Sequence, residues 1–300
     1  ASDWKARHGT PVLRRGLIGL AFTGGCVLPA LTFAPMVWSK RVLAFGAAVA
    51  IVAGILAGFD VSAVSERSRL GVTVQSGLFI AGGVAALGLA VAELTRKRDA
   101  VSLLLALWVV GVFAFASFVN WTVNGRSILP MIPAAGILLA RRLERLPDGP
   151  RFRARIMVPL AASALVSFSV TFADLRLADA QRSAAGIVQE KSRGRSVWFE
   201  GHWGFQYYME EGGARALDVR TIAARPGDVV VLPLDNTRIV GLPKAITGAI
   251  EEFDIATTSW LSTMQKQTGA GYYASTFGPL PYCFGKTPPQ RYSMVTVKAP

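Results

Sequence analysis

Residues 101–119 read VSLLLALWVVGVFAFASFV, a run without a single charged side chain. A helix of this length can cross the hydrocarbon core of a bilayer, which takes about 20 apolar residues. Five further apolar stretches flank this run in the sequence: Arg15–Trp38, Val42–Phe59, Val72–Ala92, Ile128–Ala140 and Ile156–Ala173. The pattern predicts a polytopic α-helical membrane protein with about six transmembrane helices. Ile128–Ala140 is the shortest stretch, and it spans a bilayer only with residues from its flanks.

Charge is placed in the connections between these stretches. The chain is 52% hydrophobic and 17% charged, with a net charge of +13, against roughly 25% charged residues in an average soluble domain. Most of the Lys and Arg residues that lie between the stretches are in the first, third and fifth connections: Lys40, Arg41, Arg96, Lys97, Arg98, Arg141, Arg142, Arg145, Arg151, Arg153 and Arg155. The positive-inside rule places these connections in the cytoplasm and everything after residue 173 outside. This placement argues for a membrane and against nucleic acid as the partner of the positive charge.

The polar segment after the last apolar stretch predicts a small extracytoplasmic α/β domain, so the chain is divided into residues 1–173 and 174–300. Its first part has helical periodicity, and apolar strand patterns then flank a second helical pattern, as in a βαβ unit. The expected elements are a helix at Asp174–Ser192, a strand at Ser196–Glu200, a helix at Trp203–Glu211, and strands at Asp228–Pro233, near Asp254–Thr258 and at Tyr292–Val297.

Two groups of residues in this domain are candidates for substrate or acceptor contact. Glu200, His202 and Trp203 stand where a strand ends and a helix begins, the usual place for ligands in open α/β sheets. Glu200 and His202 could form an acid–base pair and Trp203 could stack on a sugar; the alternative is a structural role for all three. Tyr272 and Tyr273 lie in a Gly/Pro-rich aromatic segment that either covers a membrane-facing cavity or is a turn-rich connector.

Arg126 is the most informative single residue of the membrane part. It stands alone at the predicted outer mouth of a span and is followed by Pro130 and Pro133, which suit the first turn of a helix. A guanidinium beside a helix start at headgroup depth is suited to a lipid-linked phosphate. The alternative is contact with ordinary phospholipid headgroups.

The run Arg126-Ser-Ile-Leu-Pro-Met-Ile-Pro133, followed by a small-residue stretch and Arg141-Arg142, resembles the late transmembrane region of polyprenyl-phosphate-sugar-dependent glycosyltransferases. These are the family 39 enzymes, relatives of protein O-mannosyltransferases and lipid A aminoarabinose transferases. The resemblance implies that an Arg-x-x-Leu-Pro element lies near the lipid-phosphate site, and that a C-terminal extracytoplasmic domain follows. It also implies a catalytic acidic residue, acting as base or metal partner, in an early external loop. No residue before Val119 matches that loop.

The sequence therefore predicts the C-terminal half of a plasma-membrane glycosyltransferase, with its catalytic acid upstream of Ala1. Its partners would be membrane lipid, a polyprenyl-phosphate-linked sugar and a glycan, lipid or protein acceptor. No cofactor is identified, and no cluster of residues with metal-ligand spacing supports a divalent metal. The alternative is a non-enzymatic membrane protein whose α/β lobe binds a partner or a glycan. A transporter is less favoured, because no ionisable residue stands in mid-span.

Overall fold

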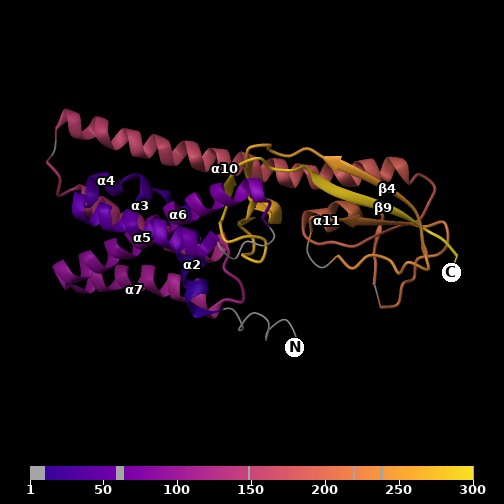
Figure 1. Ribbon diagram of the computed structural model, residues 1–300, viewed down its shortest axis with the longest axis horizontal. Coiled ribbons are helices and arrows are strands. Elements are labelled where there is room, and N and C mark those ends of the chain that lie inside the picture. Colours follow the sequence, from indigo (N-terminus) through magenta and orange to yellow (C-terminus); the bar gives the residue numbers. More distant parts are fainter. Residues whose placement is uncertain (1–10, 59–63, 148, 219, 237–238, 300) are drawn as a thin grey trace. The chain divides into compact units, whose positions relative to one another are not determined.

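A computed structural model of the chain describes all residues except 1–10, 59–63, 148, 219, 237–238 and 300 (Figure 1). It divides into two compact units, residues 1–171 with 260–286 and residues 172–259 with 287–300. The segment 260–286 therefore belongs with the helices of the first unit. The division predicted at residue 173 assigned this segment to the α/β domain, because the whole polar segment after the last apolar stretch was predicted to be one domain.

The first unit is helical. Its elements in chain order are α2 (Val12–Cys26), α3 (Leu28–Thr32), α4 (Ala34–Val37), α5 (Lys40–Gly58), α6 (Glu66–Lys97), α7 (Ala100–Ala114), η1 (Phe115–Val119), α8 (Gly125–Ile128), η2 (Leu129–Met131), α9 (Ile132–Leu143) and the start of α10 (Pro150–Lys191). Among the described residues, three helical segments are long and apolar enough to cross a membrane: Ser68–Lys97, Ala100–Val119 and Ala154–Lys191. The chain is thus a membrane protein with transmembrane helices.

Two of the predicted spans are not single long helices. The first is broken at Val27 and Phe33 into α2, α3 and α4, and the two short helices each carry a proline in the first turn. Proline lacks the N–H that would continue the preceding helix, which explains both breaks. The fifth is α9, with 12 residues after the short elements α8 and η2. The first and fifth apolar stretches therefore each consist of several short helical elements and not of one continuous helix.

Glycines bring α2 and α6 into direct backbone contact. A Cβ atom on Gly24 would collide with the carbonyl oxygen of Phe79, and one on Gly83 would collide with that of Leu20. Helices in lipid associate by close packing of small residues, since apolar surface alone gives no preference for protein over lipid. Gly82 and Gly83, in the small-residue run Gly82–Ala86, lie at this contact with α2.

The segment 260–286 forms short pairs of strands and is attached to helix α6 by hydrogen bonds of a side chain. Strand β5 (Leu261–Ser262) pairs with β8 (Cys283–Phe284), and β6 (Met264–Gln265) pairs with β7 (Ala270–Gly271), next to η3 (Lys266–Thr268). The amide of Gln75 on α6 donates to the carbonyl of Phe284 at 2.9 Å and accepts from its N–H at 2.8 Å. This exchange explains a polar residue within an apolar helix, because its amide is fully used.

The second unit contains a mixed sheet in the order β2-β1-β3-β9-β4. Its elements are β1 (Val197–Phe199), α11 (Gly204–Glu211), β2 (Arg215–Ala216), β3 (Val229–Pro233), β4 (Thr247–Ile255) and β9 (Gln290–Val297). The parallel pairing of β1 with β3 confirms the predicted βαβ unit. Strand β4 begins earlier than the expected strand near Asp254. The predicted helix at Asp174–Ser192 is continuous with the last span as α10, which also contains Pro159.

One face of this sheet carries the larger core. Ala184 and Val188 of α10 and Phe205 and Met209 of α11 pack against strand residues such as Val231. The apolar stripe of α10 in this part of the chain therefore faces the sheet, as amphipathic periodicity requires. The core fixes the turn between β1 and α11, where Glu200, His202 and Trp203 lie.

Candidate functional site

The turn that carries Arg126 is held by three polar side chains. Asn124 caps α8, since its Oδ1 accepts from the N–H of Ser127 at 2.9 Å and from the Ser127 hydroxyl at 3.0 Å. The amide of Asn120 in turn donates to the Ser127 hydroxyl at 2.7 Å. Asn at a helix N-cap is a strong local preference. These bonds fix the backbone on both sides of Arg126, whose own side chain is exposed.

The structure brings Arg126 together with Tyr272 and Tyr273. The N–H of Gly125 donates to the carbonyl of Tyr272 at 2.7 Å. A Cβ atom on Gly125 would collide with the Tyr272 ring, so only glycine permits this approach. The guanidinium of Arg126 lies 5.7 Å from the centroid of the Tyr273 ring, within the range of a cation–π contact. Residues about 150 positions apart in the sequence thus form one surface.

This surface has the chemistry of an anion site. In the part of the chain that the structure describes, Arg126 forms no ion pair with a carboxylate, so its charge is not neutralised internally. A guanidinium offers a planar set of donors that matches phosphate geometry. The faces of the neighbouring tyrosine rings add flat apolar area of the kind that packs on sugars. A phosphate-linked sugar satisfies both features.

The helix start beside Arg126 is that of the short helix α8, and not that of the helices that carry the two prolines. Pro130 and Pro133 do lie in first turns, those of η2 and α9, but Arg126 lies within the separate four-residue helix α8. A helix of this length has almost no macrodipole, since the dipole sums over aligned peptide units. The anion-binding character of the turn therefore rests on the guanidinium and not on a helix terminus.

Glu200 has a structural role. Its two carboxylate oxygens accept hydrogen bonds from the backbone N–H groups of Val240 at 2.6 Å and Gly241 at 2.9 Å, and its side chain is buried. It therefore holds the loop after β3 on the end of β1. No hydrogen bond or ion pair joins Glu200 to His202 among the described residues, so the acid–base pair considered from the sequence is not formed.

Replacing Glu200 with Ala should destabilise this loop by about 1–3 kcal/mol, because two backbone donors lose a charged acceptor. The amides of Val240 and Gly241 should then exchange with deuterium much faster than in the wild type, while those of β3 stay protected. An Asp235→Ala variant provides the comparison, since Asp235 binds Arg291 at the opposite end of the same loop region. Unchanged exchange at Val240 and Gly241 would contradict the role of Glu200.

His202 and Trp203 are exposed side chains at the start of α11. Their rings are 6.3 Å apart in an edge-to-face arrangement. Trp203 has φ 62° and ψ −133°, a backbone conformation that costs a non-glycine residue of order 1–3 kcal/mol. These two residues remain together in the second unit, and Arg126, Tyr272 and Tyr273 remain together in the first.

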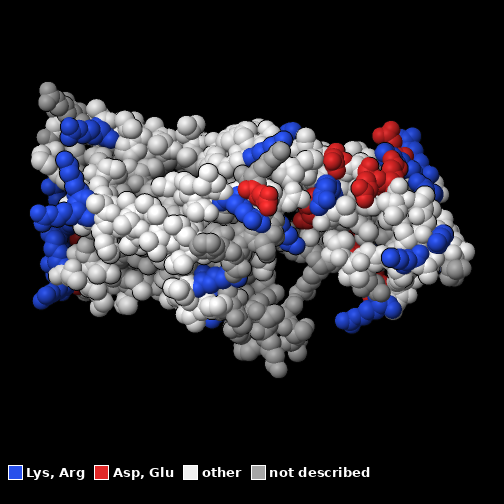
Figure 2. Space-filling view, viewed as in Figure 1, with Lys and Arg blue, Asp and Glu red and all other residues white. Residues whose placement is uncertain are grey.

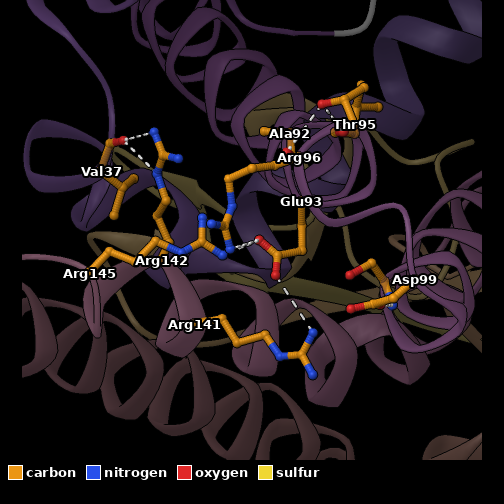
Figure 3. Close-up of polar contacts among 11 residues, drawn as sticks. Val37, Ala92, Glu93, Thr95, Arg96, Asp99, Arg141, Arg142 and Arg145 are labelled. Atoms are coloured by element: carbon orange, nitrogen blue, oxygen red, sulfur yellow. Dashed lines mark hydrogen bonds and ion pairs between the residues drawn. The ribbon is translucent and has the colours of Figure 1, made fainter.

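A further charged cluster, centred on Glu93, was not singled out from the sequence (Figure 3). Glu93 is buried at the end of α6 and forms an ion pair with Arg145; the Nη1 atom of Arg141 lies at 3.6 Å and the Nη2 atom of Arg96 at 3.7 Å. Arg142 donates through Nε and Nη2 to the carbonyl of Val37 at 3.3 and 3.2 Å. The sequence does place an acidic residue, Glu93, at the end of one apolar stretch and an arginine-rich connection after a later stretch. This combination of charges could have indicated the cluster.

Comparison of the chain with protein-family models, with curated proteins and with solved structures yields no match. Among the described residues, no group of three or more His, Cys, Asp or Glu side chains is placed to hold a metal ion. Function is therefore inferred from the geometry around Arg126 and from the residues quoted for the family resemblance.

Proposed function

We propose that this chain is the C-terminal part of an integral-membrane glycosyltransferase that transfers a sugar from a polyprenyl-phosphate donor to an envelope acceptor. Arg126 holds the donor phosphate, and Tyr272 and Tyr273 contact the sugar attached to it. The observation that carries the proposal is an exposed guanidinium without a carboxylate partner among the described residues, placed against a tyrosine ring at 5.7 Å.

The rest of the reaction is assigned by chemistry. Attack of an acceptor hydroxyl on the anomeric carbon breaks the bond to the phosphate oxygen, and the polyprenyl phosphate leaves with the negative charge. Arg126 stabilises that charge as it develops, which is the interaction that lowers a barrier. The family resemblance implies that an acidic residue accepts the proton of the acceptor. Six spans, an extracytoplasmic second unit and a plasma-membrane location belong to this proposal.

The direct test is transfer from a polyprenyl-phosphate-linked sugar by the full-length protein purified in detergent. Product should form with the lipid-linked donor and not with the corresponding nucleotide sugar. Transfer from neither donor would reject the assignment as an enzyme of this class.

Tyr273→Leu should raise KM for the donor by roughly fivefold with little change in kcat. The leucine keeps apolar volume but removes the ring that faces the guanidinium, an interaction of about 0.5–1 kcal/mol at an exposed site, and the flat surface for the sugar. Steady-state kinetics with varied donor gives the result, and Tyr273→Phe should retain wild-type KM. A Phe variant as weak as the Leu variant would mean that the hydroxyl matters and not the ring.

The second candidate is a binding protein without catalytic activity. It is favoured by the side chains of Trp203 and Tyr207, which are 49% and 62% exposed on α11. Exposed aromatic residues on a folded domain are typical of protein or glycan contact surfaces. Binding of envelope glycans by the wild type that is lost in Trp203→Ala, in a protein with no transferase activity, would favour this alternative.

A further inference from the structure

The Glu93 cluster has more positive charge than it can neutralise. Residues 93–99 and 141–145 together hold six cationic side chains and three carboxylates. Two of these carboxylates are engaged: Glu93 by three arginines, and Asp99 by the N–H of Ser102 at 2.7 Å, as the N-cap of α7. Figure 2 shows Lys and Arg side chains gathered at one end of the helical unit, on the left of the view. The two segments therefore carry more positive than negative charge.

The arginines around Glu93 are partly buried and yet reach the surface. The exposed fractions of their side chains are 26% for Arg145, 28% for Arg141 and 45% for Arg96, against 4% for Glu93. The Glu93 carboxylate compensates one of these three charges, and Asp99 also attracts Arg141. The guanidinium groups of Arg141 and Arg145 are the two that are held partly out of water. Guanidinium groups in this state are well suited to phosphate oxygens, which accept several donors at once.

The cluster lies at the ends of apolar helices, and this location favours a ligand that is itself part of the membrane. Glu93 and Arg96 stand at the end of the long apolar helix α6, and Arg141 at the end of α9. The Arg142 guanidinium lies 5.6 Å from the ring of Trp38, a residue type enriched at headgroup level. Ile137, which is 46% exposed, precedes Arg141 by four residues on the same face of α9. A phosphate bound at Arg141 would place an attached acyl chain over Ile137.

We propose that the cluster formed by Glu93, Arg96, Arg141 and Arg145 is a binding site for the headgroup of an anionic phospholipid. The headgroup phosphate accepts hydrogen bonds from the exposed faces of the three guanidinium groups, while Glu93 holds them together from the buried side. Basic clusters between transmembrane helices are suited to such headgroups, and each added cation contributes roughly a fivefold factor to affinity. This site is separate from Arg126 and does not depend on the proposed enzymatic function.

Native mass spectrometry of the intact chain in neutral detergent tests the site with two lipids, dioleoyl phosphatidylglycerol and dioleoyl phosphatidylcholine. The wild type should retain phosphatidylglycerol in preference to phosphatidylcholine. The double variant Arg96→Gln/Arg141→Gln should lose about 30-fold in phosphatidylglycerol affinity. Arg220→Gln, which removes one exposed cation from the second unit, should bind as the wild type does. Equal retention of both lipids, or an equal loss in Arg220→Gln, would overturn the proposal.

Inorganic phosphate and a second variant separate the remaining explanations. Inorganic phosphate at millimolar concentration should not displace phosphatidylglycerol; displacement would assign the site to a soluble anion. Glu93→Gln leaves three guanidinium groups without their carboxylate, so its thermal midpoint should fall in phosphatidylcholine and recover in phosphatidylglycerol. Failure of the anionic lipid to restore the midpoint also counts against the site, and this arm needs no arginine to be removed.

Discussion

Replacing Arg126 with Ala should reduce sugar transfer by the full-length enzyme at least about 100-fold, the range seen when one donor to a developing negative charge is removed. The side chain is exposed and contacts the Tyr273 ring at the surface, so we expect the fold not to depend on it. The thermal midpoint should therefore stay at the wild-type value. The measurement is kcat/KM with a polyprenyl-phosphate-linked sugar, together with thermal unfolding of the same sample.

Two further variants make this result specific. Arg126→Lys keeps the charge but loses the planar set of donors, so it should have intermediate activity. Lys266→Ala is the matched control: Lys266 is another exposed cation of the first unit, 5.2 Å from the ring of Phe277, and its loss should leave transfer unchanged. Wild-type turnover in Arg126→Ala would mean that Arg126 contacts ordinary phospholipid and not the donor.

Gly24→Ala should destabilise the helical unit by about 3 kcal/mol, at the upper end of the cost of overpacking. The added methyl group would meet the backbone of Phe79 and Gly83, which cannot rotate away as a side chain can. Helices α2 and α6 would have to separate along their contact. The expected result is a markedly lower thermal midpoint and a lower yield of folded protein in detergent.

Gly111→Ala is the matched control for this substitution. Gly111 is also a glycine in an apolar helix, α7, but a Cβ atom there meets nothing within 4 Å. The change to Ala should be neutral or slightly stabilising, since Ala has the higher helix propensity. Equal effects of the two substitutions would show that propensity, and not the contact between α2 and α6, determines the cost.

The local pattern of apolar and polar residues was sufficient to predict several helices and strands. The uncharged run 101–119 forms a continuous helical segment, α7 with η1, because an apolar stretch of this length satisfies its backbone only as a helix in lipid. The β1–α11–β3 unit followed from alternation between apolar strands and helical spacing.

Sequence pattern did not predict contacts between residues that are far apart in the chain. Hydrogen bonds connect Gly125 with Tyr272 and Gln75 with Phe284, pairs separated by more than 140 residues. The sequence around one residue of such a pair does not indicate its partner. The same reason explains why Glu93 was missed. Three arginines surround it: Arg96 from its own helix, Arg141 from the last turn of α9 and Arg145 from just after α9. The residues next to Glu93 in the chain do not indicate the last two.

By itself the sequence determined that this chain enters a membrane, where its cations gather and which arginine stands apart from them, because hydropathy and charge are properties of each residue in place. Only the tertiary structure decided that the segment 260–286 packs on the helices, that Arg126 lies against Tyr273, and that both oxygens of Glu200 are engaged by backbone amides. These are pairings between distant residues, and their selection depends on how the whole chain packs.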